Sequence, residues 1–540
     1  MVWAFAVFMI VGGIIGLIEG KTVIKGIKEI KQKLLQGNKS EEVSMHHASI
    51  RRPVLALAVF GLIAAILAAS PTQPAFAATG VSRMQTQGRW IVDDQGRAVL
   101  PVGINLVNKV APYTVDSFGF DEDDAQFLKD EGFTSVRLGI IWKEIEPQPD
   151  QYDTAYLESI KQTIELLNRY GITTLVDQHQ DLFNEQFQGE GFPDWATYTD
   201  GWPNIIKAGF PGNQFFNTAL QHAYDNFHAN KIGPGGVGIA DRFANMWGFV
   251  AGYLKETDGV IGYDLYNEPW PGTSWLACLT TAFCTGPDGL LAKIQQKATD
   301  KIHAVDPRSI VFYEPNGIFN QGTRTNVKTT GANTGFSFHV YCPSQFNGNY
   351  WACVDEDKRV FANADNHATP LNQPALLTEF GAVTDGQVLR AQSDLAMSRK
   401  MGWYYWAYTG KNDVTTSGPG DVEAIVFDPA EAPTGDNIDA GKLAQLVVMH
   451  PNAVAGTPGS YAYNRDTGVF TMTWSTTLPK GTRAAAGAVT EIAVPTRTAP
   501  NGYTVKVTGG RVVSAPNAPV LEIAQACTPS QVTVKVTRTF

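Results

Sequence analysis

The sequence predicts a (β/α)8 TIM barrel followed by a C-terminal antiparallel β-sandwich. Three observations support this fold class. Eight apolar segments of strand length recur between residues 100 and 408, helical patterns fill most of the gaps between them, and the pattern changes near residue 441. Strands that alternate with helices form parallel sheets, and eight such units in about 320 residues are typical of a closed barrel.

The predicted elements are defined by the period of their apolar residues. The eight strands cover residues 100–105, 134–140, 173–178, the segment that starts at 261 and ends at Glu268, 309–313, 335–340, 375–381 and 402–408. Helical spacing predicts helices over residues 120–131, 153–170, 241–254, 290–305 and 387–400. On this count Glu268 ends the fourth strand, and Glu379 ends the seventh.

The first 77 residues precede the predicted barrel. A pair of arginines, an apolar stretch and an Ala-x-Ala motif ending at Ala77 predict a secretory signal peptide over residues 45–77, with Met45 as an alternative start. Residues 1–44 form an apolar and basic extension. This extension is either a membrane anchor or the result of a start site placed too far upstream. We therefore expect a secreted or cell-envelope protein, and anchoring through the N-terminus stays open.

The remainder divides into three parts. Residues 78–412 form the predicted catalytic barrel, residues 413–440 a linker without a clear pattern, and residues 441–540 the β-sandwich of short strands between Gly, Pro and Asn turns. An insertion over residues 181–239, rich in Gly, Phe, Trp and Asn, follows the third strand. Loops of this length on a catalytic face are usually functional.

Composition excludes several classes of protein. The net charge of −10 argues against a nucleic-acid partner, and no phosphate-binding glycine loop follows a strand. No C-x-x-C or H-E-x-x-H motif occurs, so we expect neither a metal nor a cofactor. The oligomeric state is not encoded in any pattern that we recognise.

Four of the five cysteines form two close pairs. Cys278 is near Cys284, and Cys342 is near Cys353, each pair in a segment that reads as a loop. Because export permits disulfides, we predict two local bridges, which would leave Cys527 free. The alternative is a set of buried thiols.

Two carboxylates indicate the chemistry. Glu268 lies in an N-E-P motif after the fourth strand, and Glu379 lies in T-E-F-G at the end of the seventh. The carboxyl ends of barrel strands carry active sites. A pair of carboxylates there predicts a glycosidase, with one acid/base and one nucleophile. The alternative is that each glutamate caps a helix or pairs with an arginine.

Other strand ends carry polar or aromatic side chains that suit such a site. They are Arg137 on the second strand, His179 after the third, His339 and Tyr341 at the sixth, and Trp406 on the eighth. Glu314, at the end of the fifth strand, is a rival carboxylate. It lacks the T-E-F-G context, so we expect it at the rim or against the sugar.

Together these positions resemble glycoside hydrolase family 5. A closer resemblance is to its endoglycoceramidase branch, through residues 102–113, 121–142 and 179–196 and the N-E-P region. The resemblance covers nearly the whole barrel, and it implies that Lys109 and Asp181 contact the sugar headgroup. It also implies a β-sandwich behind the barrel. The first 77 residues have no counterpart in it.

The expected roles follow from the chemistry of retaining glycosidases. Glu379 is the nucleophile, and Glu268 is the acid/base. Arg137 and Tyr341 hold Glu379, Asn267 bonds the sugar 2-hydroxyl, His179 and His339 position hydroxyls or supporting groups, and Trp406 stacks on the sugar. The alternatives are that Arg137 forms a core ion pair and that the histidines are structural.

Three functions fit these residues. The first is an exported retaining β-glycosidase that cleaves a glycolipid between the sugar and the lipid aglycone. Another β-glycoside as substrate and an association with a membrane stay open. The second is an endo-β-glucanase, and the third a carbohydrate-binding protein without catalysis. An aglycone channel needs apolar lining, and the candidates either line it or pack the insertion: Phe192, Trp195, Trp202, Phe210, Phe215, Phe216, Trp270 and Trp275. The resemblance favours the glycolipid.

Overall fold

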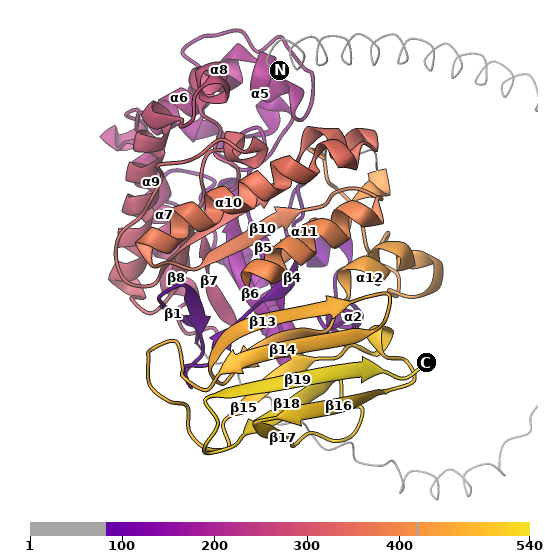
Figure 1. The fold of residues 1–540 in the computed structure, drawn as a ribbon. Helices are drawn as coiled ribbons and strands as arrows, with labels where there is room; N and C mark the ends of the chain where they lie inside the picture. The colour runs from indigo at the N-terminus through magenta and orange to yellow at the C-terminus, as the bar shows by residue number, and fades with distance from the viewer. Residues whose placement is uncertain (1–82, 417–419) are drawn as a thin grey trace, which may run out of the picture. The chain divides into compact units, whose positions relative to one another are not determined.

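Eight parallel strands close into a barrel in the computed structural model, which describes residues 83–416 and 420–540. The strands follow one another around the barrel in sequence order, and β11 pairs with β4 to close it. They are β4 (Val102–Leu106), β5 (Ser135–Ile140), β6 (Thr173–Gln178), β7 (Val260–Asp264), β8 (Ile310–Tyr313), β9 (Thr334–Val340), β10 (Ala375–Phe380) and β11 (Gly402–Tyr405). The predicted barrel is confirmed (Figure 1).

Helices follow most of these strands, as the apolar spacing predicts. The longer ones are α2 (Glu122–Asp130), α4 (Thr154–Arg169), α7 (Ile239–Leu254), α9 (Thr285–Val305), α10 (Val354–Leu371) and α11 (Gly386–Arg399). In α4 the Asp153 side chain caps the first turn, and the face with Leu157, Ile160 and Leu167 is buried. The sequence pattern does not single out α10, whose polar residues weaken the apolar stripe.

The insertion after β6 forms its own short helices and packs through aromatic side chains. It contains α5 (Gly212–Phe216) and α6 (Thr218–His228), while the short α3 (Trp142–Ile145) lies beneath it. The ring of Phe192 lies 4.0 Å from that of Phe183 and 5.1 Å from that of Trp142, measured between centroids. Phe192 therefore packs the insertion onto the barrel and is not free to line a channel.

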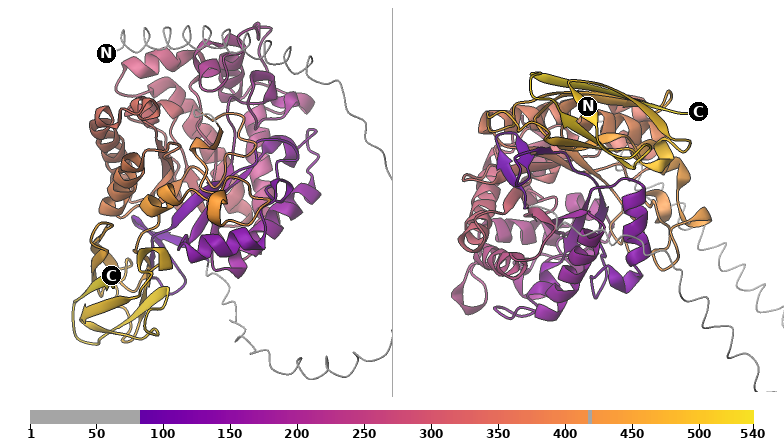
Figure 2. Two further views of the ribbon diagram at one scale, coloured as in Figure 1. Left: turned by 90° about the vertical axis from the view of Figure 1, so that its right-hand side faces the viewer. Right: turned by 90° about the horizontal axis from the view of Figure 1, so that it is seen from below.

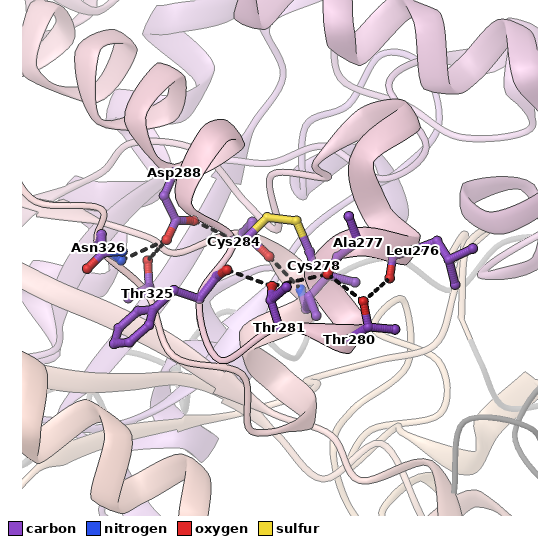
Figure 3. Close-up of a disulfide and its surroundings, with 12 residues drawn as sticks. Leu276, Ala277, Cys278, Thr280, Thr281, Cys284, Asp288, Thr325 and Asn326 are labelled. Atoms are coloured by element: carbon purple, nitrogen blue, oxygen red, sulfur yellow. Dashed lines mark hydrogen bonds between the residues drawn. A yellow bond between two sulfur atoms is a disulfide. The ribbon is translucent and has the colours of Figure 1, made fainter.

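Disulfides tether two of the loops at the carboxyl end of the barrel. Cys278, in α8 (Trp275–Thr280), bonds to Cys284 just before α9, and Cys342 bonds to Cys353 before α10. Figure 3 shows the first bridge beside Asp288, whose carboxylate accepts hydrogen bonds from the Thr325 hydroxyl and the Asn326 backbone. Cys527 is an exposed free thiol.

Two antiparallel sheets form the C-terminal domain. The four-stranded sheet has the order β13 (Thr457–Asn464), β14 (Val469–Ser475), β19 (Gln531–Arg538), β16 (Tyr503–Thr508). Alternate residues such as Phe470, Met472 and Trp474 are buried, as expected for a sheet with one face in a core. The C-terminal strands, in yellow, form one group beside the barrel in both views of Figure 2.

The second sheet also includes strands from the start of the described chain. Its order is β1 (Gln85–Gln87), β2 (Trp90–Val92), β3 (Ala98–Val99), β12 (His450–Val454), β15 (Val489–Ala493), β18 (Val520–Gln525), β17 (Gly510–Val512). The sequence pattern places residues 85–99 with the barrel, yet β3 pairs with β12, about 350 residues away by the strand bounds. α12 (Ala440–Leu446) leads into β12.

The predicted extension (residues 1–44) and signal peptide (residues 45–77) lie outside the described residues. Within residues 83–416 and 420–540, no helix has both the length and the hydrophobicity needed to cross a membrane.

Candidate active site

Arg137, on the inner side of β5, is the centre of a buried charge network. Its guanidinium has no exposed surface and donates to Asp264 Oδ2 at 2.9 Å, Asp177 Oδ1 at 2.8 Å and Glu379 Oε1 at 2.8 Å. Burial opposes the charge of Arg137, but these carboxylates hold its pKa well above the usual value. A buried cation is stable only with such a set of acceptors, and the network fixes the position of Glu379.

Glu379 lies at the end of β10, where the sequence predicts the nucleophile. Besides the bond from Arg137, its Oε2 accepts a hydrogen bond from the Tyr341 hydroxyl at 3.1 Å. Burial raises the pKa of Glu379 to about 7; His339 and Arg137 oppose this rise, and Glu268 adds to it. The carboxyl group is therefore close to half ionised near neutral pH.

Glu268 follows β7 and faces the same space. Its Oε1 accepts a hydrogen bond from Asn320 Nδ2 at 2.6 Å and lies 2.9 Å from His339 Nδ1. Its backbone has a φ of +43°, which non-glycine residues rarely adopt. The backbone N–H donates to Glu314 Oε2 at 2.9 Å, which holds that conformation. Strained backbone held in this way is typical of functional positions.

His339 lies between the two glutamates. A carboxylate oxygen of Glu268, a ring nitrogen of His339 and a carboxylate oxygen of Glu379 all lie within 4.8 Å of one another. The His339 ring is buried, and burial disfavours its charge. Even so, Glu314 and Glu379 raise its pKa well above the usual value, which favours the imidazolium form.

The expectation that Glu314 lies at the rim is wrong. Its side chain is only 3% exposed, and Oε1 accepts from Arg137 Nη2 at 3.1 Å and lies 3.2 Å from His339 Nε2. Glu314 thus supports the site from below by fixing Arg137, the His339 ring and the backbone of Glu268.

Asn267 is anchored by the same network. Its Oδ1 accepts from Arg137 Nη2 at 2.9 Å, and its Nδ2 donates to the Gln180 carbonyl at 3.1 Å. The amide is 1% exposed and immediately precedes Glu268. Its bond to a sugar hydroxyl stays a prediction.

A second group, which we call the shelf, consists of Lys109, His179, Asp181 and Trp406. The Lys109 ammonium lies 2.7 Å from Asp181 Oδ2 and 4.3 Å from the centroid of the Trp406 ring. The His179 ring stacks on Trp406 with centroids 5.2 Å apart. His179 Nδ1 lies 2.7 Å from Asp177, the same aspartate that accepts from Arg137, so the shelf and the glutamates share one network.

The shelf is strongly charged. Burial disfavours the cation of His179, yet Asp177 and the hydrogen bonds raise its pKa to about 10. Burial also opposes ionisation of Asp181, but Lys109 and His179 hold its pKa below the usual range. Charged donors and an acceptor beside an aromatic face are the groups that bind sugar hydroxyls and stack on sugar rings.

Several site residues escape prediction from sequence. Asp413 and Thr415, from the patternless linker, contact Lys109 Nζ at 3.0 and 2.8 Å. Asn320 lies in a short 3-10 helix, Gly317–Gln321, and reaches Glu268 from a segment with no recognisable motif. Asp177 and Asp264 do carry a signal, because a charge inside an apolar strand is rarely buried without a partner.

Two clusters have the spacing of metal ligands: Glu268, His339 and Glu379, and His179, Asp181 and Glu190. In each, a cationic side chain already contacts a carboxylate: Arg137 contacts Glu379, and Lys109 contacts Asp181. Each cation therefore already balances the charge of one carboxylate in its cluster. The expected absence of a metal stays a prediction.

The fold and the paired carboxylates define an O-glycosyl hydrolase. Residues 92–412 match the family described as cellulase (glycosyl hydrolase family 5), and residues 450–536 match the glycoside hydrolase family 5 C-terminal domain. The chain therefore belongs to glycoside hydrolase family 5.

Its relatives include several endoglycoceramidases. The chain is 32% identical to endoglycoceramidase I of Rhodococcus hoagii (strain 103S) over 476 residues, which cover 85% of this chain and 89% of the relative. It is 28% identical to the endoglycoceramidase of Hydra vulgaris over 72% of this chain and 76% of that one. Endo-glycoceramidase II from Rhodococcus sp. superimposes with a TM-score of 0.66 at 26% identity, over 84% of this chain and all of that one. The predicted family and branch are confirmed.

Proposed function

We propose that this enzyme hydrolyses, with retention of configuration, the β-glycosidic bond between the sugar and the lipid of a glycolipid. The distance between Glu268 and Glu379 supports the retaining mechanism in this proposal. Retaining glycosidases place their carboxyl groups about 5–5.5 Å apart, and inverting ones about 6.5–9.5 Å apart to admit a water. Carboxylate oxygens of Glu268 and Glu379 within 4.8 Å of each other support the retaining arrangement.

The steps follow from the contacts. Glu379 attacks the anomeric carbon while Glu268 gives its proton to the departing oxygen, and a glycosyl ester forms. Glu268 then takes a proton from water, the water oxygen attacks the anomeric carbon, and the Glu379 carboxylate is released. Arg137 and Tyr341 favour the ionised, oriented form of Glu379 before attack. The shelf holds the sugar through Lys109, Asp181 and Trp406.

An apolar group that includes Trp270, two residues after Glu268 in the sequence, supports a lipid aglycone. The ring of Phe215 lies 5.1 Å from that of Trp270 and 5.1 Å from that of Trp275, between centroids. Neighbouring Phe216 and Leu276 are 43% and 53% exposed. Exposed apolar side chains gathered beside a site mark contact with an apolar partner. The names of the relatives point to the same substrate class.

We also propose that the enzyme is exported, with the signal peptide at residues 45–77. The Ala-x-Ala motif and the two disulfides support this. N-terminal sequencing of the enzyme from the culture medium is expected to begin after Ala77. A purely cytosolic protein that still carries residues 45–77 would contradict the proposal.

The substrate test compares a glucosylceramide, an oligoglycosyl ceramide and a soluble β-glucan in the same detergent. Full-length enzyme should release sugar and ceramide from a glycolipid, and proton NMR should show the β-anomer first. Cleavage of the glucan alone would establish the endo-β-glucanase instead. An α-anomer as first product would refute retention.

A further inference from the structure

Glu190 is a buried acid beside the shelf that the mechanism does not use. It has no exposed surface, and neither of its carboxylate oxygens receives a hydrogen bond from any residue that the structure describes. One of these oxygens lies within 4.8 Å of a His179 ring nitrogen and of an Asp181 oxygen. A buried polar group without partners is costly and calls for an explanation.

The local backbone holds Glu190 in this position. Asp181 and Glu190 exchange both backbone hydrogen bonds, at 3.2 and 2.9 Å, so their side chains are fixed as neighbours. A Cβ on Gly189 would meet the Asp181 carbonyl at 1.9 Å, and Gly191 has a φ of +128°. The two flanking glycines allow this close approach, and no other residue type fits there without a backbone shift.

The ammonium of Lys109, one of the two cations near Glu190, has no donor left for it. An ammonium has three N–H donors. Those of Lys109 are directed to Asp181 at 2.7 Å, Thr415 at 2.8 Å and Asp413 at 3.0 Å. To pair with Lys109, an ionised Glu190 would have to draw the ammonium away from one of these partners. His179, whose Nε2 has no hydrogen-bond partner among the described residues, is the other cationic group nearby.

The groups that face Glu190 determine its charge. Burial, and then the negative charge of Asp181, raise the pKa of Glu190 well above the usual value; Asp413 also raises it, while Lys109 and His179 oppose the rise. Its unpaired oxygens and two anionic neighbours disfavour an ionised carboxylate here, and the charges of Lys109 and His179 offset this only in part. The folded shelf therefore favours the uncharged acid.

We propose that Glu190 is a positioning residue of the sugar shelf: as an uncharged acid it leaves all three donors of Lys109 to Asp181, Asp413 and Thr415. Its ionisation draws Lys109 off Asp181 and off the face of Trp406, and so sets an alkaline limit on sugar binding. This inference rests on the proposed function in one respect, that the shelf holds the sugar. Glu190 contacts neither catalytic glutamate in the described structure, so the effect falls on KM and not on kcat.

The test compares Glu190→Gln, which cannot ionise, with wild type and with Glu185→Gln. The control makes the same change in the same insertion, at a half-exposed glutamate that pairs with Lys143. KM and kcat for a β-linked disaccharide glycoside are measured across alkaline pH. KM of wild type and of the control should rise about tenfold per pH unit above the limit. KM of Glu190→Gln should begin to rise only at a higher pH than KM of wild type, with kcat unchanged. An unshifted limit in Glu190→Gln would overturn the inference.

A binding measurement separates this result from catalysis. In a Glu379→Gln background, tryptophan fluorescence reports the Kd of the free disaccharide with and without Glu190→Gln. If Glu190 acts as an uncharged acid, Glu379→Gln with and without Glu190→Gln should have similar Kd values at neutral pH. At alkaline pH the double variant should bind more tightly. Loss of binding at neutral pH in the double variant would refute it.

Thermal unfolding tests the ionisation without any substrate. The folded state keeps the Glu190 proton while the unfolded chain loses it above the ordinary Glu pKa, so stability falls as pH rises from that value to the raised one. The Tm of Glu190→Gln should fall less over this range than the Tm of wild type, and identical slopes would overturn the inference. If wild type cleaves no β-glycoside while the slopes differ, only the proposed function fails.

Discussion

The hydrogen bond from Tyr341 to Glu379 should set the acid limb of activity. The nucleophile must be ionised to attack, so kcat/KM should rise with pH through the pKa of Glu379, which is about 7. The Tyr341 hydroxyl donates to Oε2 and favours the ionised form. Tyr341→Phe removes this donor and keeps the ring, so the pKa of Glu379 should increase.

The size of the shift follows from the bond length. Hydrogen bonds to charged groups contribute about 1.5–3 kcal/mol. The O–H···O⁻ distance of 3.1 Å exceeds the usual range for such bonds, so the lower end applies. About 1.5 kcal/mol corresponds to roughly one pKa unit, which moves the acid limb to about 8 and lowers kcat/KM about tenfold below the limb.

The assay is kcat/KM for an aryl β-glycoside across pH for wild type, Tyr341→Phe and Tyr253→Phe. The last variant removes a similar bond at the surface, from Tyr253 to Glu158 at 2.8 Å. It should leave the limb in place. An acid limb that stays unchanged in Tyr341→Phe would refute either the assignment of the limb to Glu379 or the role of the hydroxyl. If Glu379→Gln keeps activity, the assignment of the limb to Glu379 is the part that is wrong.

Three further predictions concern the substrate and the two carboxylates. Glu379→Gln should lower turnover roughly 10³-fold or more, about 4 kcal/mol of barrier, because an amide cannot form the ester; near-normal turnover would disprove the nucleophile. Glu268→Ala should still cleave substrates with good leaving groups, and azide should restore turnover with a β-glycosyl azide as product; an α-azide would count against a retaining acid/base. Trp270→Ala and Trp275→Ala should lower kcat/KM for a ceramide glycoside far more than for an aryl glycoside, since each buried methylene contributes about 0.8 kcal/mol. Equal losses on both substrates, with a lower Tm, would mean that these rings only pack the loop.

The sequence by itself determined the barrel and the places where its functional groups emerge. The apolar period of each strand is a local property, and parallel strands in a barrel deliver their carboxyl ends to one face. Glu268 and Glu379, far apart in the chain, therefore had to meet once both were recognised at strand ends. Arg137, His339 and Tyr341 followed by the same logic.

Only the tertiary structure decided how each group is supported. Glu314 and Glu379 both follow apolar strands, yet one is buried beneath His339 and the other faces the site, because strand twist and loop path set the direction of each side chain. Asn320, Asp413 and Thr415 come from connecting segments whose conformation depends on packing with distant segments. The pairing of β3 with β12 is likewise non-local. The hydrophobic period is a property of each local segment, whereas the contact partners of a side chain depend on which distant segments pack together in the folded chain. The sequence therefore predicts the catalytic pair but not its surroundings.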